Sequence, residues 1–182
     1  MKKWKVDKSW TLFLDRDGVI NERIFGGYVE SIDQFIFKKG SLESLIKFNL
    51  TFGKIIIVTN QQCIAKEIIS MEQLNNIHMY MLEEIEKIGG RVDRIYVATE
   101  LKDSLPHHRK PNSSMALKAQ NDFNDIDFRK SIMVGDTDSD IEFGKNLGMK
   151  TVLMKSKEVT FQKPDISINS LNELCDYFLS YY

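Results

Sequence analysis

The fold of this chain is indicated by one stretch near its start, Phe13-Leu14-Asp15-Arg16-Asp17-Gly18-Val19-Ile20-Asn21. The apolar run Thr11–Leu14 predicts a buried strand that ends abruptly at two acidic residues. Because alternate residues of a strand point the same way, Asp15 and Asp17 can both face one point beyond its end. Converging carboxylates repel each other unless a cation or a proton lies between them. The stretch predicts a site for metal-assisted chemistry on an anion, or, taken alone, an ordinary acidic turn.

Length and composition favour one globular domain over residues 1–182. The net charge of -1 offers no electrostatic basis for binding nucleic acid or an anionic membrane. No apolar run approaches the length of a membrane span, and the start of the chain lacks the apolar core of a signal peptide. Cys63 and Cys175 are too few for a disulfide framework. We therefore expect free thiols in a reducing cytoplasm. We also expect a monomer, because the fold needs no partner.

Strands and helices alternate along the chain. Further strands are predicted at 54–60, 92–98, 131–134, 151–154 and 165–168, with a short edge strand at 35–37. Helices are predicted at about 41–51, 71–88, 113–123, 141–147 and 171–180. This alternation predicts an α/β fold, with a parallel sheet covered by helices on both faces.

Polar clusters follow the predicted strands at the edge where ligands bind in such sheets. They are Asp15 with Asp17, Thr59 with Asn60, the loop that carries Arg109 and Lys110, and Asp136 with Asp140. Four such coincidences are hard to explain as turns. The functional interpretation of the first stretch is therefore preferred.

These residue types suit phosphoryl transfer. Asp15 comes first off the strand and can attack phosphorus to form an aspartyl-phosphate. Asp17 can protonate the leaving oxygen and later deprotonate the attacking water, a role worth about 10²- to 10⁴-fold in rate. Asp136 and Asp140 add oxygen donors that suit Mg²⁺ better than zinc. The Thr59 hydroxyl, the backbone N–H groups near Asn60 and the charge of Lys110 can stabilise the phosphoryl oxygens.

The order of these pieces resembles the haloacid dehalogenase (HAD) superfamily of phosphohydrolases. The matching pieces are the stretch from Asp15 to Asn21, Thr59-Asn60-Gln61, Arg109-Lys110-Pro111 and Gly135-Asp136 to Asp140. Each is weak alone, but together they span nearly the whole chain in the family's order. The residues of these pieces are most similar to those of one branch, which holds the D-glycero-D-manno-heptose 1,7-bisphosphate phosphatases and the histidinol-phosphate phosphatases.

The resemblance implies a Rossmann-like fold with little or no cap, dependence on Mg²⁺, Asp15 as nucleophile and Asp17 as acid and base. It implies metal ligation by Asp15, the backbone carbonyl of Asp17 and Asp136, and we add Asp140 as a candidate. Thr59 and Lys110 would stabilise the phosphoryl group. Arg109 would reach the substrate, with Asn60 and Gln61 as further substrate-binding candidates.

Two departures from that branch affect the expected pocket. Many members carry a zinc loop, Cys-x-His and Cys-x-Cys, before Arg-Lys-Pro. The corresponding positions here are Ala98, Glu100, Pro106 and His108, which offer two donors at best, so we predict no structural zinc. His107 and His108 then remain as loop residues, with a substrate contact as the alternative. The second departure is Gln62-Cys63 where the branch often has Ser-Gly, and Cys63 is interpreted as buried packing rather than a redox thiol.

We therefore expect a Mg²⁺-dependent phosphomonoesterase that acts on a small phosphorylated metabolite. A heptose bisphosphate is the first candidate and histidinol phosphate the second. The neutral charge balance argues against a polynucleotide phosphatase. A non-catalytic module that binds a phosphorylated ligand would be indicated by loss of Asp15 or Asp17, and both are present.

Overall fold

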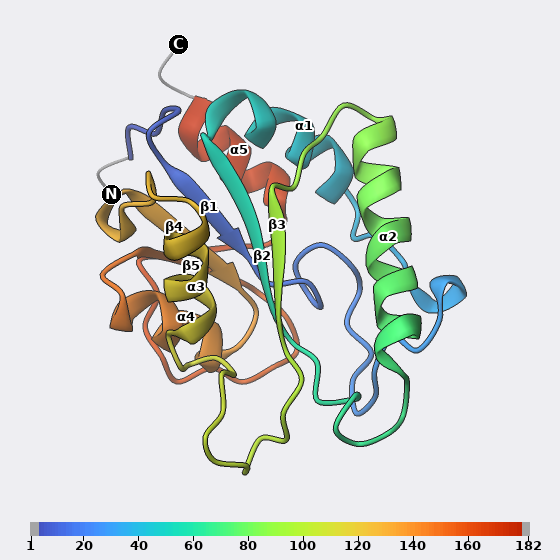
Figure 1. Cartoon of the computed structure of the whole chain (residues 1–182). Coiled ribbons are helices and arrows are strands. Elements are labelled where there is room, and N and C mark those ends of the chain that lie inside the picture. The colour runs from blue at the N-terminus through green and yellow to red at the C-terminus, as the bar shows by residue number, and fades with distance from the viewer. Residues whose placement is uncertain (1–3, 180–182) are drawn as a thin grey trace.

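The computed structural model describes residues 4–179, which form a six-stranded parallel sheet with helices on both faces (Figure 1). The strands are β1 (Thr11–Leu14), β2 (Lys54–Asn60), β3 (Arg94–Ala98), β4 (Ser131–Gly135), β5 (Lys150–Met154) and β6 (Ile166–Ile168), in the order β3-β2-β1-β4-β5-β6. The predicted α/β fold is confirmed. No helix within this range is long and apolar enough to cross a membrane.

The helices divide between the two faces of the sheet. They are α1 (Ser41–Thr51), α2 (Met71–Lys87), α3 (Ser114–Asp122), α4 (Asp138–Asn146) and α5 (Leu171–Leu179), with short 3-10 helices at Ile32–Gln34 and Phe128–Lys130. Buried side chains of α1, α2 and α5 share one core with Leu12, Leu14, Ile55 and Ile57. Those of α3 and α4 share the other with Phe13, Ile56 and Val58. The continuous apolar runs therefore arise because alternate residues of each strand enter opposite cores.

Several sequence-based boundaries move in the structure. The predicted edge strand at 35–37 is wrong, because Phe37 makes only an isolated antiparallel bridge to Asn21. Phe35 is buried instead, with its ring 6.1 Å from that of Tyr80 on α2. The helix predicted at 141–147 begins at Asp138, because Thr137 and Asp140 form a capping box. Position 180, the predicted end of the last helix, lies outside the described residues.

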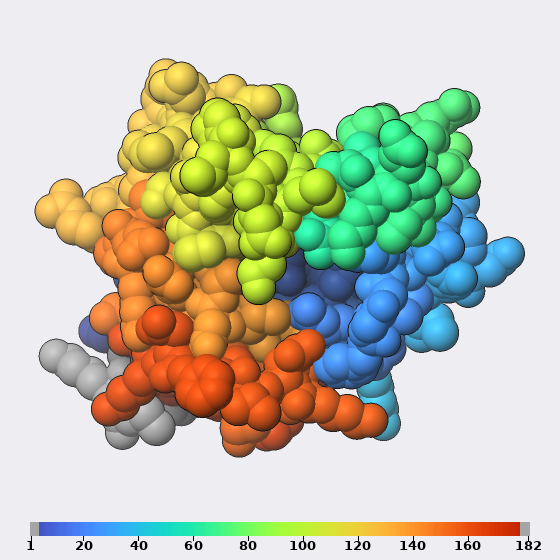
Figure 2. All heavy atoms as spheres, turned by 90° about the horizontal axis from the view of Figure 1, so that it is seen from below, coloured from blue at the N-terminus to red at the C-terminus, as the bar shows by residue number. Residues whose placement is uncertain are grey.

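The chain turns at the carboxyl edge of the sheet through the segments that will form the site. The segment after β1, residues 22–40 (here called the flap), and the loop after β3, residues 99–113, are connections rather than a second folded layer. Figure 2 shows the molecule from below: dark-blue atoms from the start of the chain lie deep in a hollow between light-blue, green and orange segments. The end of the central strand β1 therefore lies at the bottom of a depression walled by residues from distant parts of the chain.

Candidate active site

A cavity of about 570 Å³ opens at this edge of the sheet. Its lining comes from the end of β1, the flap, the end of β2, the loop after β3, the start of α4 and the loop after β5. The lining residues used below are Asp15, Asp17, Arg23, Thr59, Asn60, Lys102, His107, Arg109, Lys110 and Asp140. Six segments that are separate in sequence thus contribute to one pocket.

Three buried carboxylates meet at the bottom of the site. Asp15, Asp136 and Asp140 each offer an oxygen, and these oxygens lie within 4.8 Å of one another. Asp15 leaves the end of β1, Asp136 follows β4, and Asp140 lies in the first turn of α4. The parallel pairing of β1 with β4 brings them together. The sequence predicts that Asp15 and Asp136 converge because each directly follows a strand. The side chain of Asp17, expected to face the same point as Asp15, is not part of this cluster.

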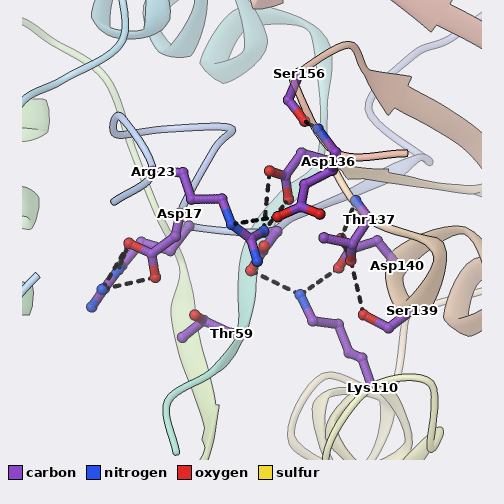
Figure 3. Close-up of polar contacts among 12 residues, drawn as sticks. Asp17, Arg23, Thr59, Lys110, Asp136, Thr137, Ser139, Asp140 and Ser156 are labelled. Carbon is purple, nitrogen blue, oxygen red and sulfur yellow. Dashed lines mark hydrogen bonds and ion pairs between the residues drawn. The ribbon is translucent and has the colours of Figure 1, made fainter. Parts of the chain in front are cut away.

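Two cations compensate part of this negative charge (Figure 3). Lys110 is buried, and its Nζ lies 2.8 Å from Asp15 Oδ1 and 2.6 Å from Asp140 Oδ1. It also donates to the carbonyl oxygen of Val58 at 2.7 Å. Arg23 of the flap donates from Nη1 to both oxygens of Asp136, at 3.0 and 3.1 Å.

Burial leaves the carboxylates short of positive charge. Burial, reinforced by neighbouring carboxylates, raises the pKa of Asp15 to about 6 and that of Asp136 to about 7. Burial alone would lower the pKa of Lys110, but Asp140 and Asp15 raise it above its ordinary value. The site therefore favours a further cation.

The donor set fits a hard divalent ion. All the converging groups are carboxylate oxygens, the ligands that Mg²⁺ prefers. Gly18 has φ +91°, and a Cβ there would come within 2.2 Å of Asp136 Oδ2, so only glycine lets the backbone approach this carboxylate. Asp140 already accepts from the backbone N–H and hydroxyl of Thr137 at 3.1 and 2.7 Å. Asp136 accepts from Arg23 at both oxygens and Asp15 pairs with Lys110, so each of the three carboxylates already has a partner. Metal ligation by Asp15, Asp136 and Asp140 stays a prediction.

The carboxylate of Asp17 lies apart from this cluster (Figure 3). It accepts hydrogen bonds from Arg16 Nη2 at 2.9 and 2.8 Å, Asn21 Nδ2 at 2.9 Å and Gln61 Nε2 at 2.7 Å. Burial alone would raise the pKa of Asp17, but Arg16 and the other donors hold it below its ordinary value. Asp17 nevertheless lines the pocket, with a quarter (25%) of its side chain exposed.

The other predicted residues divide between the pocket wall and its support. The Thr59 hydroxyl accepts from Gln61 Nε2 at 2.8 Å, and Gln61 is buried beneath it. Asn60 Oδ1 accepts from the backbone N–H of Lys110 at 3.0 Å, which ties the end of β2 to the loop after β3. Arg109 lines the pocket and donates to the Glu100 carbonyl at 3.1 Å. Substrate contacts of Asn60, Gln61 and Arg109 stay predictions.

Three residues that shape the site were not predicted from the sequence. Arg16 and Asn21 both contact Asp17, and their only signal was their place inside the first motif. Arg23 contacts Asp136 across 113 residues of sequence, a pairing with no local signal.

The two departures noted in the sequence also have positions in the structure. His108 Nε2 lies 4.0 Å from Glu100 Oε1, and His108 is exposed. His107 lines the pocket with a buried Nδ1 that has no hydrogen-bond partner among the described residues. Cys63 is fully buried in the core, as expected of a packing residue. The absence of structural zinc stays a prediction.

An acidic pair after the central strand, a buried lysine and acidic residues after β4 define the phosphohydrolase class of HAD proteins. Comparison with known proteins agrees. A family model described as HAD-hydrolase-like matches residues 107–174. The D-glycero-alpha-D-manno-heptose-1,7-bisphosphate 7-phosphatase of Campylobacter jejuni is 34% identical over 171 residues, 94% of this chain and 96% of its own. The D-glycero-beta-D-manno-heptose-1,7-bisphosphate 7-phosphatase of Helicobacter pylori is 32% identical over 91% of this chain and 95% of its own.

A solved structure shows the same fold. The D,D-heptose 1,7-bisphosphate phosphatase of B. bronchiseptica, complexed with magnesium and phosphate, has a TM-score of 0.83 at 23% identity, covering 93% of this chain and 98% of its own. The chain belongs to the HAD-like hydrolases, in the family of the heptose-bisphosphate phosphatases that it matches. It is a phosphatase.

Proposed function

We propose that this phosphatase hydrolyses the 7-phosphate of a D-glycero-D-manno-heptose 1,7-bisphosphate with Mg²⁺ as cofactor. The observation that best supports this is the position of the Asp15 carboxylate. It follows β1, lines the pocket and lies 2.8 Å from Lys110 Nζ. Relatives at 32% and 34% identity over nearly their whole lengths are 7-phosphatases of this sugar. One is named for the alpha anomer and the other for the beta, so the anomer is left to experiment.

The chemistry follows from the residues on the pocket floor. Asp15 attacks phosphorus, while Lys110 and Thr59 donate to the phosphoryl oxygens as charge develops on them. Asp17 protonates the oxygen of the departing sugar and then takes a proton from the water that cleaves the aspartyl-phosphate. Asp15, the backbone carbonyl of Asp17 and Asp136 would hold Mg²⁺, with Asp140 as the further candidate. When bound, the ion neutralises charge on the phosphoryl group and the carboxylates.

The wall of the pocket supports a substrate with a second anionic group. Lys102, His107 and Arg109 line it, all from the loop after β3. A retained phosphate would be attracted to these side chains, and Arg109 can bind it with two parallel hydrogen bonds. Histidinol phosphate carries an amine at its far end instead. The positive charges of Lys102 and Arg109 therefore favour the bisphosphate.

Phosphate release with Mg²⁺ across a substrate panel tests this function. The panel holds both heptose bisphosphate anomers, histidinol phosphate, common sugar monophosphates and a 3′-phosphorylated oligonucleotide. We expect the highest kcat/KM for one heptose anomer, and a rise in its KM in Arg109→Ala. Lys118→Ala, on the exposed surface of α3, is the matched control. Preference for histidinol phosphate, or uniformly poor turnover, would overturn the substrate assignment.

We further propose that the protein works as a single-domain monomer in the cytoplasm, without nucleic acid or membrane partners. The net charge of -1 and the buried free thiols of Cys63 and Cys175 support this setting. The molar mass measured by light scattering after size-exclusion chromatography tests whether the protein is a monomer, and the mass of a stable dimer would contradict this proposal.

A further inference from the structure

We infer that His78, on α2, is a positioning residue for the acid–base step, because it holds Arg16 and Arg16 in turn orients the carboxylate of Asp17. This inference rests on the proposed function, in which Asp17 transfers the protons. His78 itself does not line the pocket.

The contact chain begins with a buried guanidinium. Arg16 has no exposed surface, and its Nε and Nη2 donate to Asp17 at 3.2 Å and at 2.9 and 2.8 Å. Such a planar fork fixes the direction of a carboxylate as well as its position. Its remaining nitrogen, Nη1, lies 2.9 Å from Nε2 of His78.

The chemistry of the pair assigns the role of each nitrogen. A guanidinium has N–H groups and no acceptor, so Nε2 of His78 accepts the hydrogen bond and its proton lies on Nδ1. Burial, with the positive charge of Arg16 beside it, lowers the pKa of His78 to about 3, which agrees with a neutral ring. His78 thus supplies an uncharged acceptor to a buried cation that already has its counter-ion.

His78 is held in place by the packing of α2. His78 lies in the middle of α2, on the buried side with Leu74, Ile77 and Met81. The helix starts at a capping box between Ser70 and Gln73. Asn21 and Gln61 also donate to Asp17, so loss of His78 should tilt the carboxylate rather than free it. A tilt is sufficient, because small misplacements of a catalytic group can cost on the order of 100-fold in rate.

The test uses the dependence of an acid-catalysed step on its leaving group. A sugar alkoxide needs a proton as it departs, whereas 4-nitrophenolate leaves without one. We would measure release of the leaving group in single turnovers for the heptose bisphosphate and for 4-nitrophenyl phosphate. In His78→Leu we expect a roughly 10- to 100-fold loss for the sugar, little loss for the aryl ester and little change in KM.

A second variant separates orientation from packing. In His78→Gln an amide oxygen can accept from Arg16, so most of the rate with the sugar should return. His78→Met has comparable bulk without that acceptor, and it should lose the rate selectively even if His78→Leu does not fold. Melting curves by circular dichroism establish that each variant compared is folded.

Asp17→Asn serves as the reference for the proposed function. If Asp17→Asn slows leaving-group release equally for both substrates, the acid–base role of Asp17 is wrong. If Asp17→Asn is selective but the folded His78 variants lose both substrates equally, or lose neither, only the role of His78 is overturned. A loss of rate with the sugar alone in His78→Leu or His78→Met, together with recovery in His78→Gln, supports the role of His78.

Discussion

Nζ of Lys110 lies 2.8 Å from Oδ1 of Asp15, and the two side chains are only 2% and 11% exposed. The same ammonium lies 2.6 Å from Asp140 Oδ1. One cation thus serves two buried carboxylates, one of which is the proposed nucleophile. Removing it takes the nearest cation from two carboxylates that are too buried to be fully solvated by water.

Lys110→Met should therefore destabilise the protein by about 3–5 kcal/mol near neutral pH. Without the lysine the folded-state pKa of Asp15, already raised to about 6, rises further above its unfolded value, so the loss relative to the wild type grows as pH increases above about 6. Urea unfolding at pH 5 and pH 7.5 measures this difference. Lys102→Met, on the exposed part of the same loop, is the control. Equal destabilisation at the two pH values would contradict the ion-pair explanation.

Asp15→Asn should abolish turnover while the fold survives, because the amide keeps the shape of the carboxylate but is a poor nucleophile. Mass spectrometry of acid-quenched reactions should detect a phosphorylated enzyme in the wild type and none in the variant. Asp33→Asn, exposed in the flap, should behave like the wild type. Near-normal turnover by Asp15→Asn would exclude the covalent route.

Binding of Mg²⁺ should strengthen with pH. The pKa of Asp15 is raised from 3.8 to about 6 and that of Asp136 from 3.8 to about 7. The metal-free folded protein then binds more protons than the unfolded chain between about pH 4 and pH 7, so these groups lower its stability as pH rises. Mg²⁺ must displace those protons, which adds up to about tenfold in affinity per pH unit for each proton displaced.

Thermal melting with and without Mg²⁺ at pH 5 and pH 8 measures that effect. We expect a small rise in Tm at pH 5 and a larger one at pH 8. Asp136→Asn should remove most of the rise and should stabilise the metal-free protein at pH 8. A pH-independent rise that persists in Asp136→Asn would exclude Asp136 from the metal site.

Elemental analysis of protein purified without added metal should find no zinc. Ala98 and Pro106 carry no donor at two of the four positions that correspond to the expected zinc loop. A chelator should accordingly leave the melting temperature of the protein purified without added metal unchanged. A stoichiometric zinc signal would show that the loop after β3 binds the ion through other residues.

Most strands and helices could be predicted from the sequence because each strand packs into two cores at once and is therefore continuously apolar. Runs such as Ile55 to Val58 are apolar at every position, and each neighbouring residue proves to face a different core. The start of a helix was harder to predict where a capping residue, rather than the first apolar residue of the helix, sets it. α4 begins at Asp138, before the first apolar residue of its stripe, because the turn is closed by Thr137 and Asp140.

The residues 35–37 show why a short apolar run is ambiguous. An apolar run with polar residues on either side suits an edge strand, yet the Phe35 ring packs against Phe37 at 5.0 Å and against Tyr80 of α2. Aromatic burial beneath a helix stabilises this segment without a partner strand.

The chemistry of this protein is set by its sequence, because acidic residues placed directly after buried parallel strands must reach one edge of the sheet. Only the tertiary structure decided how those charges are shared. Asp15, Asp136 and Asp140 gather around Lys110, while Asp17, two residues from Asp15, turns to Arg16. The contacts from His78 to Arg16 and from Arg23 to Asp136 likewise join segments far apart in the chain. Such pairings depend on strand order and on helix packing, and no local pattern of residues encodes them.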